Sequence, residues 1–232
     1  MGLLHVCEKK SESLFTKSDV SFINNVSRIG AIALENVRMY EQIQGDYLKT
    51  ITAFALAVDA RDSYTMHHSE NVAKYSQAIA KKMQCSHNEI ELIKNSALLH
   101  DIGKIGVKDS VLLKNGKLTP DEFEHIKLHC AKGEEIVRGL PFLKEASLLI
   151  RHHHERYDGS GYPDGIKGPK IELGARILAV ADSFDAMTTA RPYRNALSTT
   201  EALRELERNK GIQFDPEVAE CLEEIIKQGL SV

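Results

Sequence analysis

Histidine is the residue type in this 232-residue chain with the most potential for chemistry, because six of its ten histidines lie between positions 100 and 154. Imidazole nitrogens mixed with carboxylate oxygens suit iron, manganese or zinc in a catalytic site better than a cysteine-rich structural zinc site. Five or six such ligands suit two ions about 3.5–4 Å apart, which activate a bridging water for displacement at phosphorus. The cluster therefore predicts metal-assisted hydrolysis. Its histidines are His100, His125, His129, His152, His153 and His154.

The adjacent pair His100 and Asp101 ends an apolar helical run and precedes Gly103, Lys104 and Gly106. Successive residues of a helix point about 100° apart, so both side chains reach one metal site only if it lies over the helix end. A pair of ions makes this easier, because one carboxylate can bridge them. A lone His-Asp pair is weak evidence for a metal site, and the other candidate ligands strengthen that evidence.

Each further candidate has an ordinary structural alternative. His125 and His129 share one helix face, but His125 can equally be a solvated surface residue. Of the three histidines 152–154, one must point elsewhere, and the pair at 67 and 68 can have a single inward member. Asp182 ends an apolar run, where a buried carboxylate needs a partner.

Composition excludes several classes of function. A net charge of −3 provides no basic surface for DNA or RNA, whose binding domains usually have a pI above about 9. The longest uncharged apolar stretch, around residues 51–58, is far shorter than the roughly 20 residues of a membrane span. The four cysteines form no CxxC pair, and the N-terminus lacks the pattern of a signal peptide. These features predict a cytoplasmic protein with reduced thiols.

The elements that must position the candidates are predicted to be almost entirely α-helical. Residues 2–7 are predicted to form a short strand, and Asp19 can cap a helix that follows. Beyond residue 58 the chain shows repeated helix signals and little strand alternation. Helix starts are predicted at the capping residues Thr119, Ser198 and Asp215, and residues 157–165 are rich enough in turn residues to form an irregular loop.

A heptad pattern runs through the first long helical stretch. Apolar residues recur at alternating steps of three and four from Ile23 to Val58, and only Gly30 and Gln44 interrupt the pattern. The pattern favours a parallel homodimer through this N-terminal helix. Packing of the helix on its own domain explains the part beyond Tyr47 equally well.

Three ordered motifs resemble the HD-GYP family. They are residues 98–107 (LLHDIGKIGV), residues 153–165 (HHERYDGSGYPDG) and residues 179–188 (AVADSFDAMT), followed by RPYR at 191–194. The resemblance covers roughly Tyr47 to Leu230 and places an HD-GYP phosphohydrolase domain at 47–232. It implies the all-α helical bundle of the HD superfamily, here with a long N-terminal linker helix and a short N-terminal strand.

The family resemblance also implies an activity and a set of site residues. The activity is hydrolysis of the bacterial second messenger cyclic di-GMP to pGpG, and in some members to GMP, by two divalent ions, typically iron or manganese, that activate a bridging hydroxide. Asp101 would bridge the ions, and Lys104 would approach the substrate phosphate or the hydroxide. The ligands carried over are His68, His100, Asp101, His129, His153, His154 and Asp182.

Substrate contacts are implied at Lys104, Tyr162, Arg191 and Arg194. The two arginines match positions that hold phosphate or guanine groups, for which the planar guanidinium fork is suited. Tyr162 can either touch the substrate or only shape the pocket. Members with a third metal use an extra glutamate where this chain has Tyr64, so a two-metal centre is expected.

The first 46 residues are predicted to be a separate segment. The start, the charged loop and the helix ending at Tyr40 resemble the last strand and last helix of a GAF sensor domain, of which most is missing. The chain is therefore expected to be a truncated piece, and this segment is expected to have no sensing activity. Alternatives for the whole chain are hydrolysis of another cyclic dinucleotide such as cyclic GMP-AMP, or a catalytically weak cyclic di-GMP receptor.

Overall fold

The computed structural model describes residues 4, 6–7, 14–61, 67–114, 116–190 and 195–229, and the side chains of 59–61 are outside this description. All elements that it assigns in these ranges are helical, so the all-α prediction is confirmed. The strand expected at residues 2–7 is not supported, because Leu4, Val6 and Cys7, the part of that segment that is described, have no regular structure. None of the described helices is long and apolar enough to cross a membrane.

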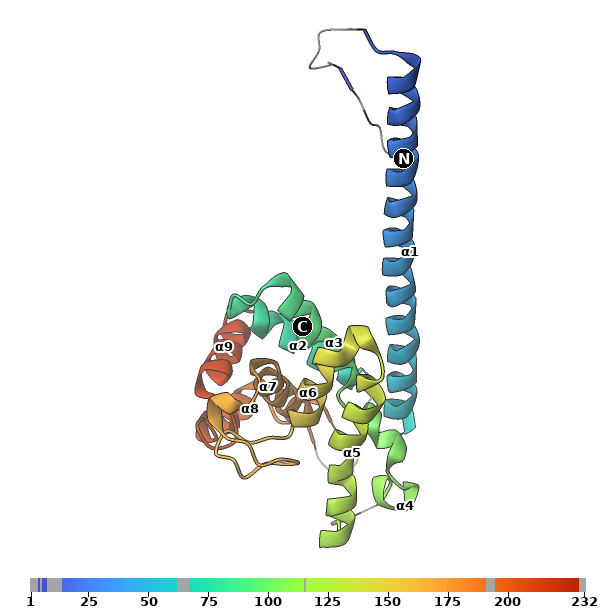
Figure 1. Cartoon of the computed structure of the whole chain (residues 1–232). Helices are drawn as coiled ribbons and strands as arrows, with labels where there is room; N and C mark the ends of the chain where they lie inside the picture. The colour runs from blue at the N-terminus through green and yellow to red at the C-terminus, as the bar shows by residue number, and fades with distance from the viewer. Residues whose placement is uncertain are drawn as a thin grey trace. The chain divides into compact units, whose positions relative to one another are not determined.

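The chain divides into two compact units, Met1–Thr50 and Ile51–Val232. Helix α1 (Lys17–Arg61) is a continuous 45-residue helix, and most of its residues belong to the first unit (Figure 1). Its start differs from the prediction that Asp19 is the cap. Thr16 precedes the helix, its hydroxyl accepts a hydrogen bond from the Asp19 amide at 3.2 Å, and the Asp19 carboxylate accepts one from the Thr16 amide at 2.7 Å. Asp19 therefore completes a capping box in which Thr16 is the cap.

The second unit is a bundle of short helices (Figure 1). After the end of α1, its elements are α2 (His68–Lys82), α3 (His87–Leu99), η1 (Ile102–Gly106), α4 (Asp109–Leu112), α5 (Pro120–Arg138), η2 (Pro141–Leu143), α6 (Lys144–His152), η3 (Gly168–Lys170), α7 (Leu173–Thr188), α8 (Thr199–Arg208) and α9 (Pro216–Lys227).

Side-chain caps define where several of these helices begin. Thr119 and Ser198 each form a complete capping box, with Glu122 and Glu201 respectively, and the Asp215 carboxylate caps α9. All three predicted starts are confirmed. Because caps act within a few residues of the chain, the sequence is sufficient to locate them.

Helix α7 is the centre of the core. It is apolar almost all round, which is typical of a helix surrounded by others, and it packs against α2, α3, α6, α8 and α9. Its largest fully buried side chains are Ile177, Leu178 and Phe184. Asp182 and Asp185 project from this same helix, so the core element also carries acidic groups toward the end of α3 and the start of α2.

Two glycines permit close approaches that shape the site. A Cβ at Gly103 would lie 1.9 Å from the His129 carbonyl oxygen, so only glycine lets η1 pack directly on the backbone of α5. A Cβ at Gly161 would lie 2.2 Å from the Arg156 amide nitrogen, so only glycine lets the loop 155–165 fold back on its own start. Both substitutions require backbone to move.

Candidate metal centre

Five separate segments of the second unit bring the seven predicted metal ligands together. The start of α2 supplies the first histidine, the end of α3 supplies the His-Asp pair, α5 and the end of α6 supply three histidines, and α7 supplies an aspartate. His68, His100, Asp101, His129 and His153 are buried, whereas His154 and Asp182 keep partial exposure. The residues are His68, His100, Asp101, His129, His153, His154 and Asp182.

The donor atoms fall into two groups joined by one carboxylate. Ligand atoms of His68, His100 and Asp101 lie within 4.8 Å of one another, and so do those of His129, Cys130 and His153. Asp101 Oδ2 lies 3.3 Å from His100 Nε2, while its other oxygen, Oδ1, lies 3.4 Å from His129 Nε2. The two oxygens of one carboxylate therefore face different groups, which is the arrangement that a bridging ligand requires.

The buried rings of His100, His129 and His153 are oriented in the same way. In each, Nδ1 donates a hydrogen bond to the backbone carbonyl three residues earlier, at 2.8, 2.7 and 2.6 Å respectively. This contact places the proton on Nδ1 and leaves the Nε2 lone pair free. His129 Nε2 and His153 Nε2 lie 3.3 Å apart. Metal-bound histidines characteristically have such a partner at the other ring nitrogen, so these rings fit a metal centre.

His68 has a carboxylate in the corresponding role. Its Nδ1 lies 2.7 Å from Asp185 Oδ2, and Asp185 Oδ1 accepts a hydrogen bond from Asn71 at 2.9 Å. The other ring nitrogen, Nε2, lies 3.2 Å from Asp182 Oδ1. Asp185 and Asn71 were not identified from the sequence. The available signal was that Asp185, like Asp182, is a carboxylate within the apolar helix α7.

The protonation states of His129, His153 and His154 suit cation binding. Burial, reinforced by neighbouring histidines, lowers the pKa of His129 and His153, and it lowers the pKa of His154 to about 4. These imidazoles are therefore neutral at physiological pH, and neutral imidazole is the form that ligates metal. Burial also raises the pKa of the Cys130 thiol. Cys130 Sγ lies 3.5 Å from His129 Nε2, so a neutral thiol borders the site, which the sequence analysis did not foresee.

The acidic groups remain ionised in spite of their surroundings. Burial alone would raise the pKa of Asp101, but Lys104 and His100 outweigh it and hold that pKa well below its usual range. Asp182 is likewise held below its usual range, mainly by His68. Burial disfavours a charged His68, but Asp182 and Asp185 outweigh it and raise the pKa of His68 to about 10. The donor set of imidazole nitrogens and ionised carboxylates fits divalent ions of the iron and manganese type.

The structure places two of the predicted substrate-contacting residues beside the cluster and does not describe the other two. Lys104 Nζ lies 2.7 Å from Asp101 Oδ2 and its side chain is 16% exposed, so it is beside the cluster and accessible. The Tyr162 ring lies 5.0 Å from the ring of His154, and burial raises the pKa of its hydroxyl, which keeps that group protonated. Arg191, Arg194 and Tyr64 lie outside the described residues.

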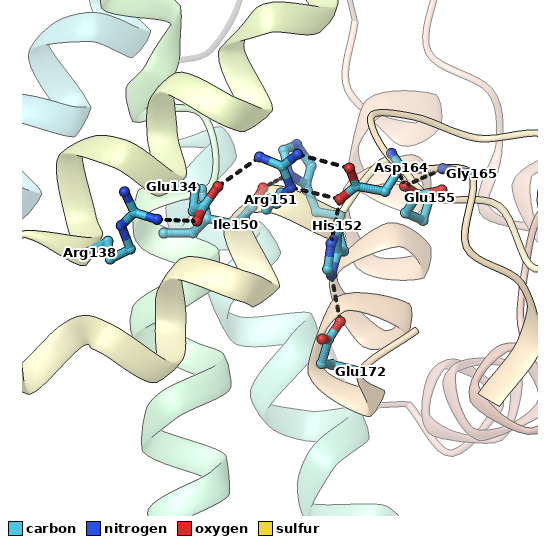
Figure 2. Close-up of polar contacts among 10 residues, drawn as sticks. Glu134, Arg138, Ile150, Arg151, His152, Glu155, Asp164, Gly165 and Glu172 are labelled. Atoms are coloured by element: carbon cyan, nitrogen blue, oxygen red, sulfur yellow. Dashed lines mark hydrogen bonds and ion pairs between the residues drawn. The ribbon is translucent and has the colours of Figure 1, made fainter. Parts of the chain in front are cut away.

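Three other histidines are not brought into the cluster. His67 is exposed and pairs with Glu70, so the 67–68 pair has one inward member. His125 Nε2 accepts a hydrogen bond from the Lys108 amide at 3.4 Å, away from the metal ligands. His152 points to a separate set of carboxylates and is the member of 152–154 that faces elsewhere (Figure 2).

His152 belongs to a group that we call the Asp164 clamp, formed by Arg151, His152, Asp164 and Glu172 (Figure 2). Arg151 binds Asp164 through two parallel contacts of 2.6 and 2.8 Å. His152 Nε2 lies 2.9 Å from Asp164, and its Nδ1 lies 2.7 Å from Glu172. The clamp fastens the loop 155–165 to the end of α6, immediately beside the ligands His153 and His154.

The buried Glu155 joins the start of the same loop to its end. Its Oε1 accepts hydrogen bonds from the amides of Asp164 and Gly165, at 2.6 and 2.9 Å (Figure 2). The loop therefore returns to the residue that follows ligand His154. Sequence reasoning identified the loop as irregular but did not identify these contacts, because they join residues 9 and 10 positions apart.

This helical fold with its His-Asp cluster defines a class of protein. The model of the family described as HD domain matches residues 52–218, and the chain belongs to that family. The resemblance found in the sequence is thereby confirmed for this part of the chain. The GAF resemblance of the first 46 residues stays a prediction.

Several curated relatives are similar over about three quarters of the chain. It is 43% identical over 176 residues to the cyclic di-GMP phosphodiesterase response regulator RpfG of Xanthomonas campestris, covering 75% of this chain and 47% of the relative. It is 41% identical over 181 residues to 3′3′-cGAMP-specific phosphodiesterase 3 of Vibrio cholerae, covering 78% and 39%. It is 45% identical over 170 residues to a cyclic di-GMP phosphodiesterase of Thermotoga maritima, covering 72% and 46%. The chain spans less than half the length of these relatives.

Solved structures support the fold. A Vibrio cholerae cyclic GMP-AMP specific phosphodiesterase, V-cGAP3, has a TM-score of 0.64 at 21% identity and covers 78% of this chain and 49% of its own. The HD domain of the Listeria monocytogenes phosphodiesterase PgpH has a TM-score of 0.54 at 18% identity and covers 77% and 97%. At these identities the likeness concerns the fold alone.

Proposed function

We propose that this chain is a metal-dependent phosphodiesterase that hydrolyses cyclic di-GMP to pGpG, with GMP as the product where the second phosphodiester bond is also cleaved. The observation that carries the proposal is the position of Asp101, whose two oxygens face two separate groups of histidine nitrogens. Relatives named as cyclic di-GMP phosphodiesterases, 43% and 45% identical to this chain, support the choice of substrate.

The chain's own residues have distinct roles in this proposal. Asp101 joins the two halves of the centre, and the remaining ligands are His68, His100, His129, His153, His154 and Asp182. Two divalent ions, of iron or manganese, supply Lewis acidity and an activated water when bound. Lys104 places a fixed positive charge beside Asp101, where it offsets the negative charge that develops on phosphoryl oxygens.

The substrate reaches this centre from the side of Tyr162. We assign contacts with the dinucleotide to Lys104, Tyr162, Arg191 and Arg194. The guanidinium groups would provide the local positive charge that a chain with a net charge of −3 otherwise lacks for an anionic ligand. The four cysteines form no disulfide bond among the described residues, which favours a reducing, cytoplasmic location.

A second candidate substrate is 3′3′-cGAMP. The relative from Vibrio cholerae named as specific for that dinucleotide is 41% identical to this chain, so the two candidates have similar support. A catalytically weak cyclic di-GMP receptor is the alternative in which the site binds without turnover.

Product analysis by chromatography separates these functions. Protein purified anaerobically and loaded with iron or manganese is incubated with cyclic di-GMP, 3′3′-cGAMP and cyclic di-AMP. We expect pGpG and GMP from cyclic di-GMP, loss of product in His100→Ala, and unchanged turnover in the matched control His125→Ala. Faster turnover of 3′3′-cGAMP would reassign the substrate. Binding without product in fully metallated protein would indicate the receptor.

We also propose that the segment 1–46 is a GAF-like remnant with a linker helix and that the catalytic domain occupies 47–232. The division of the chain after Thr50 and the family match from residue 52 support a boundary in this region. A proteolysis experiment that releases a folded, active fragment beginning near residue 47 would support the assignment. A fragment that is unfolded would contradict it.

The first unit supports a further proposal, that two copies pair through α1. The heptad residues Val26, Val37, Tyr40 and Tyr47 are 46–62% exposed, which is unusual for apolar side chains at regular helical spacing. Sedimentation analysis should show a dimer that Tyr40→Lys dissociates. Met39→Lys, an equally exposed position outside the heptad seam, should leave the dimer intact. A wild-type chain that is monomeric at all concentrations would refute the pairing.

A further inference from the structure

A continuous row of rings leads from the metal centre to the protein surface. The rings of His153 and His154 lie 4.1 Å apart, and those of His154 and Tyr162 lie 5.0 Å apart. Tyr162 then meets Phe123 edge to face at 6.2 Å and an interplanar angle of 80°. Phe123 is 45% exposed, although aromatic side chains are usually covered. The exposed Phe123 ring is thus connected through Tyr162 to the metal ligand His154.

A cation lies at the junction of the two outer rings. Lys127 Nζ is 4.8 Å from the centre of the Phe123 ring and 5.5 Å from that of Tyr162. Lys127 and Phe123 are four residues apart on α5, so they share a face of that helix. The ammonium group also contacts Glu124 at 2.6 Å, and the Glu124 side chain is 68% exposed. The pair is thus at the protein surface, where an anionic ligand can compete for the cation.

The loop that carries Tyr162 is held in place before any ligand binds. The Asp164 clamp fastens the loop two residues after Tyr162, and Glu155 binds the same part of the loop through two amides. Phe123 lies on α5, which also carries His129, and its ring is in edge-to-face contact with that of Tyr162. A base that stacks on the exposed Phe123 ring therefore meets an aromatic pair already in position, which reduces the entropy that binding costs.

We propose that Phe123, Lys127 and Tyr162 form a subsite that binds a purine base of the substrate, next to the centre that cleaves the phosphodiester. The proposal rests on the proposed function and names the part of the site that recognises the base. A flat base stacks on an aromatic face, and the ammonium group interacts with the neighbouring phosphate. Because every base has a π face, this subsite adds affinity for either purine and does not distinguish guanine from adenine.

The test compares two ligands that differ only in the base. The manganese-loaded 232-residue chain is titrated by calorimetry with GMP and with ribose 5-phosphate, which keeps the sugar and phosphate and lacks the purine. Phe123→Ala should weaken GMP binding about tenfold, in line with the loss of one stacking contact, and leave ribose 5-phosphate binding unchanged. Phe123→Trp should retain GMP binding. Ile136→Ala, an exposed apolar residue on the same helix, is the matched control and should have no effect.

Two results would overturn the subsite. One is a Phe123→Ala variant that binds GMP as tightly as the wild type. The other is an equal loss of affinity for GMP and for ribose 5-phosphate, which would show that the substitution disturbs binding of the phosphate and not of the base. Metal content, measured for each variant, must stay equal for the comparison.

Kinetics provide an independent readout. With cyclic di-GMP as substrate, Phe123→Ala should raise KM about tenfold and leave kcat nearly unchanged, because stacking acts equally on the bound substrate and the transition state. A fall in kcat with constant KM would contradict the assignment. If the wild type turns over no cyclic dinucleotide, the proposed function fails, whereas the GMP titration still decides whether the subsite exists.

Discussion

At the scale of single residues, the centre depends on hydrogen bonds made by the histidine ring nitrogen that does not face the other ligands. Three histidines use backbone carbonyls for this purpose, and His68 uses the Asp185 carboxylate. Backbone partners cannot be removed by substituting a side chain. Asp185 can be changed, so it offers a direct test of how strongly orientation controls metal binding.

Asp185→Asn should lower metal affinity about tenfold, because the charge that orients His68 and raises its basicity is lost while the shape is kept. Manganese titration followed by calorimetry measures the change. Asp158→Asn, in the loop and remote from His68, is the control and should bind manganese normally. Equal affinities in the wild type and Asp185→Asn would show that Asp185 does not support the ligand.

Lys104 tests the catalytic part of the centre. Lys104→Met should reduce kcat for cyclic di-GMP about 100-fold, since it removes a positive charge near the reacting phosphoryl group. Bound metal, measured by atomic emission, should stay at the wild-type level. Lys108→Met serves as the control for the loss of a nearby lysine. Wild-type turnover in Lys104→Met would remove Lys104 from the mechanism.

At the scale of elements, the loop 155–165 is the segment whose position depends most on side-chain contacts. Hydrogen bonds from Arg151 and His152 lower the pKa of Asp164 to about 2, below its usual value of 3.8. A carboxylate with a lowered pKa stabilises the fold at pH values above its ordinary pKa, and this contribution is lost as the pH falls toward 2. Asp164 is therefore ionised at neutral pH and available to the positive charge of Arg151.

Asp164→Asn should loosen the loop without unfolding the domain. Hydrogen–deuterium exchange at pH 7 should become faster in peptides covering 155–165, because the amides of Asp164 and Gly165 lose their fixed position against Glu155. Peptides from α7 should exchange at the wild-type rate, as should both regions in Asp121→Asn, which changes an exposed aspartate on α5. Unchanged exchange in the loop would mean that Glu155 alone holds it.

At the scale of the whole molecule, metal binding should contribute to the stability of the second unit. A ligand at 100 times its Kd stabilises the native state by about 2.7 kcal/mol, and in a protein of this size that corresponds to roughly 5–10 °C in Tm. Removing metal with a chelator should lower Tm by this amount, and added manganese should restore it. His100→Ala should show a much smaller response. A Tm independent of manganese in the wild type would contradict a metal centre in the bundle.

The helix starts and the identity of the ligand-bearing motifs were predictable from sequence for one physical reason, which is that they depend on neighbours in the chain. Thr119 caps α5 through Glu122, three residues away, and the apolar pattern of α7 already marked Asp182 as a carboxylate in need of a partner. Two local predictions differ from the structure. The strand expected at residues 2–7 is not supported, and the cap of α1 is Thr16, three residues before the predicted cap Asp19.

The sequence by itself determined that the chain is helical, where several of its helices begin and which residues have the donor atoms for two metal ions. Only the tertiary structure decided how these residues come together in space. Asp185 reaches His68 across 117 residues of sequence, Asp101 faces both halves of the centre, and Phe123 stands beside Tyr162. These contacts depend on how helices pack around α7, and no short-range pattern specifies that packing, because the residues it brings together lie far apart in the chain.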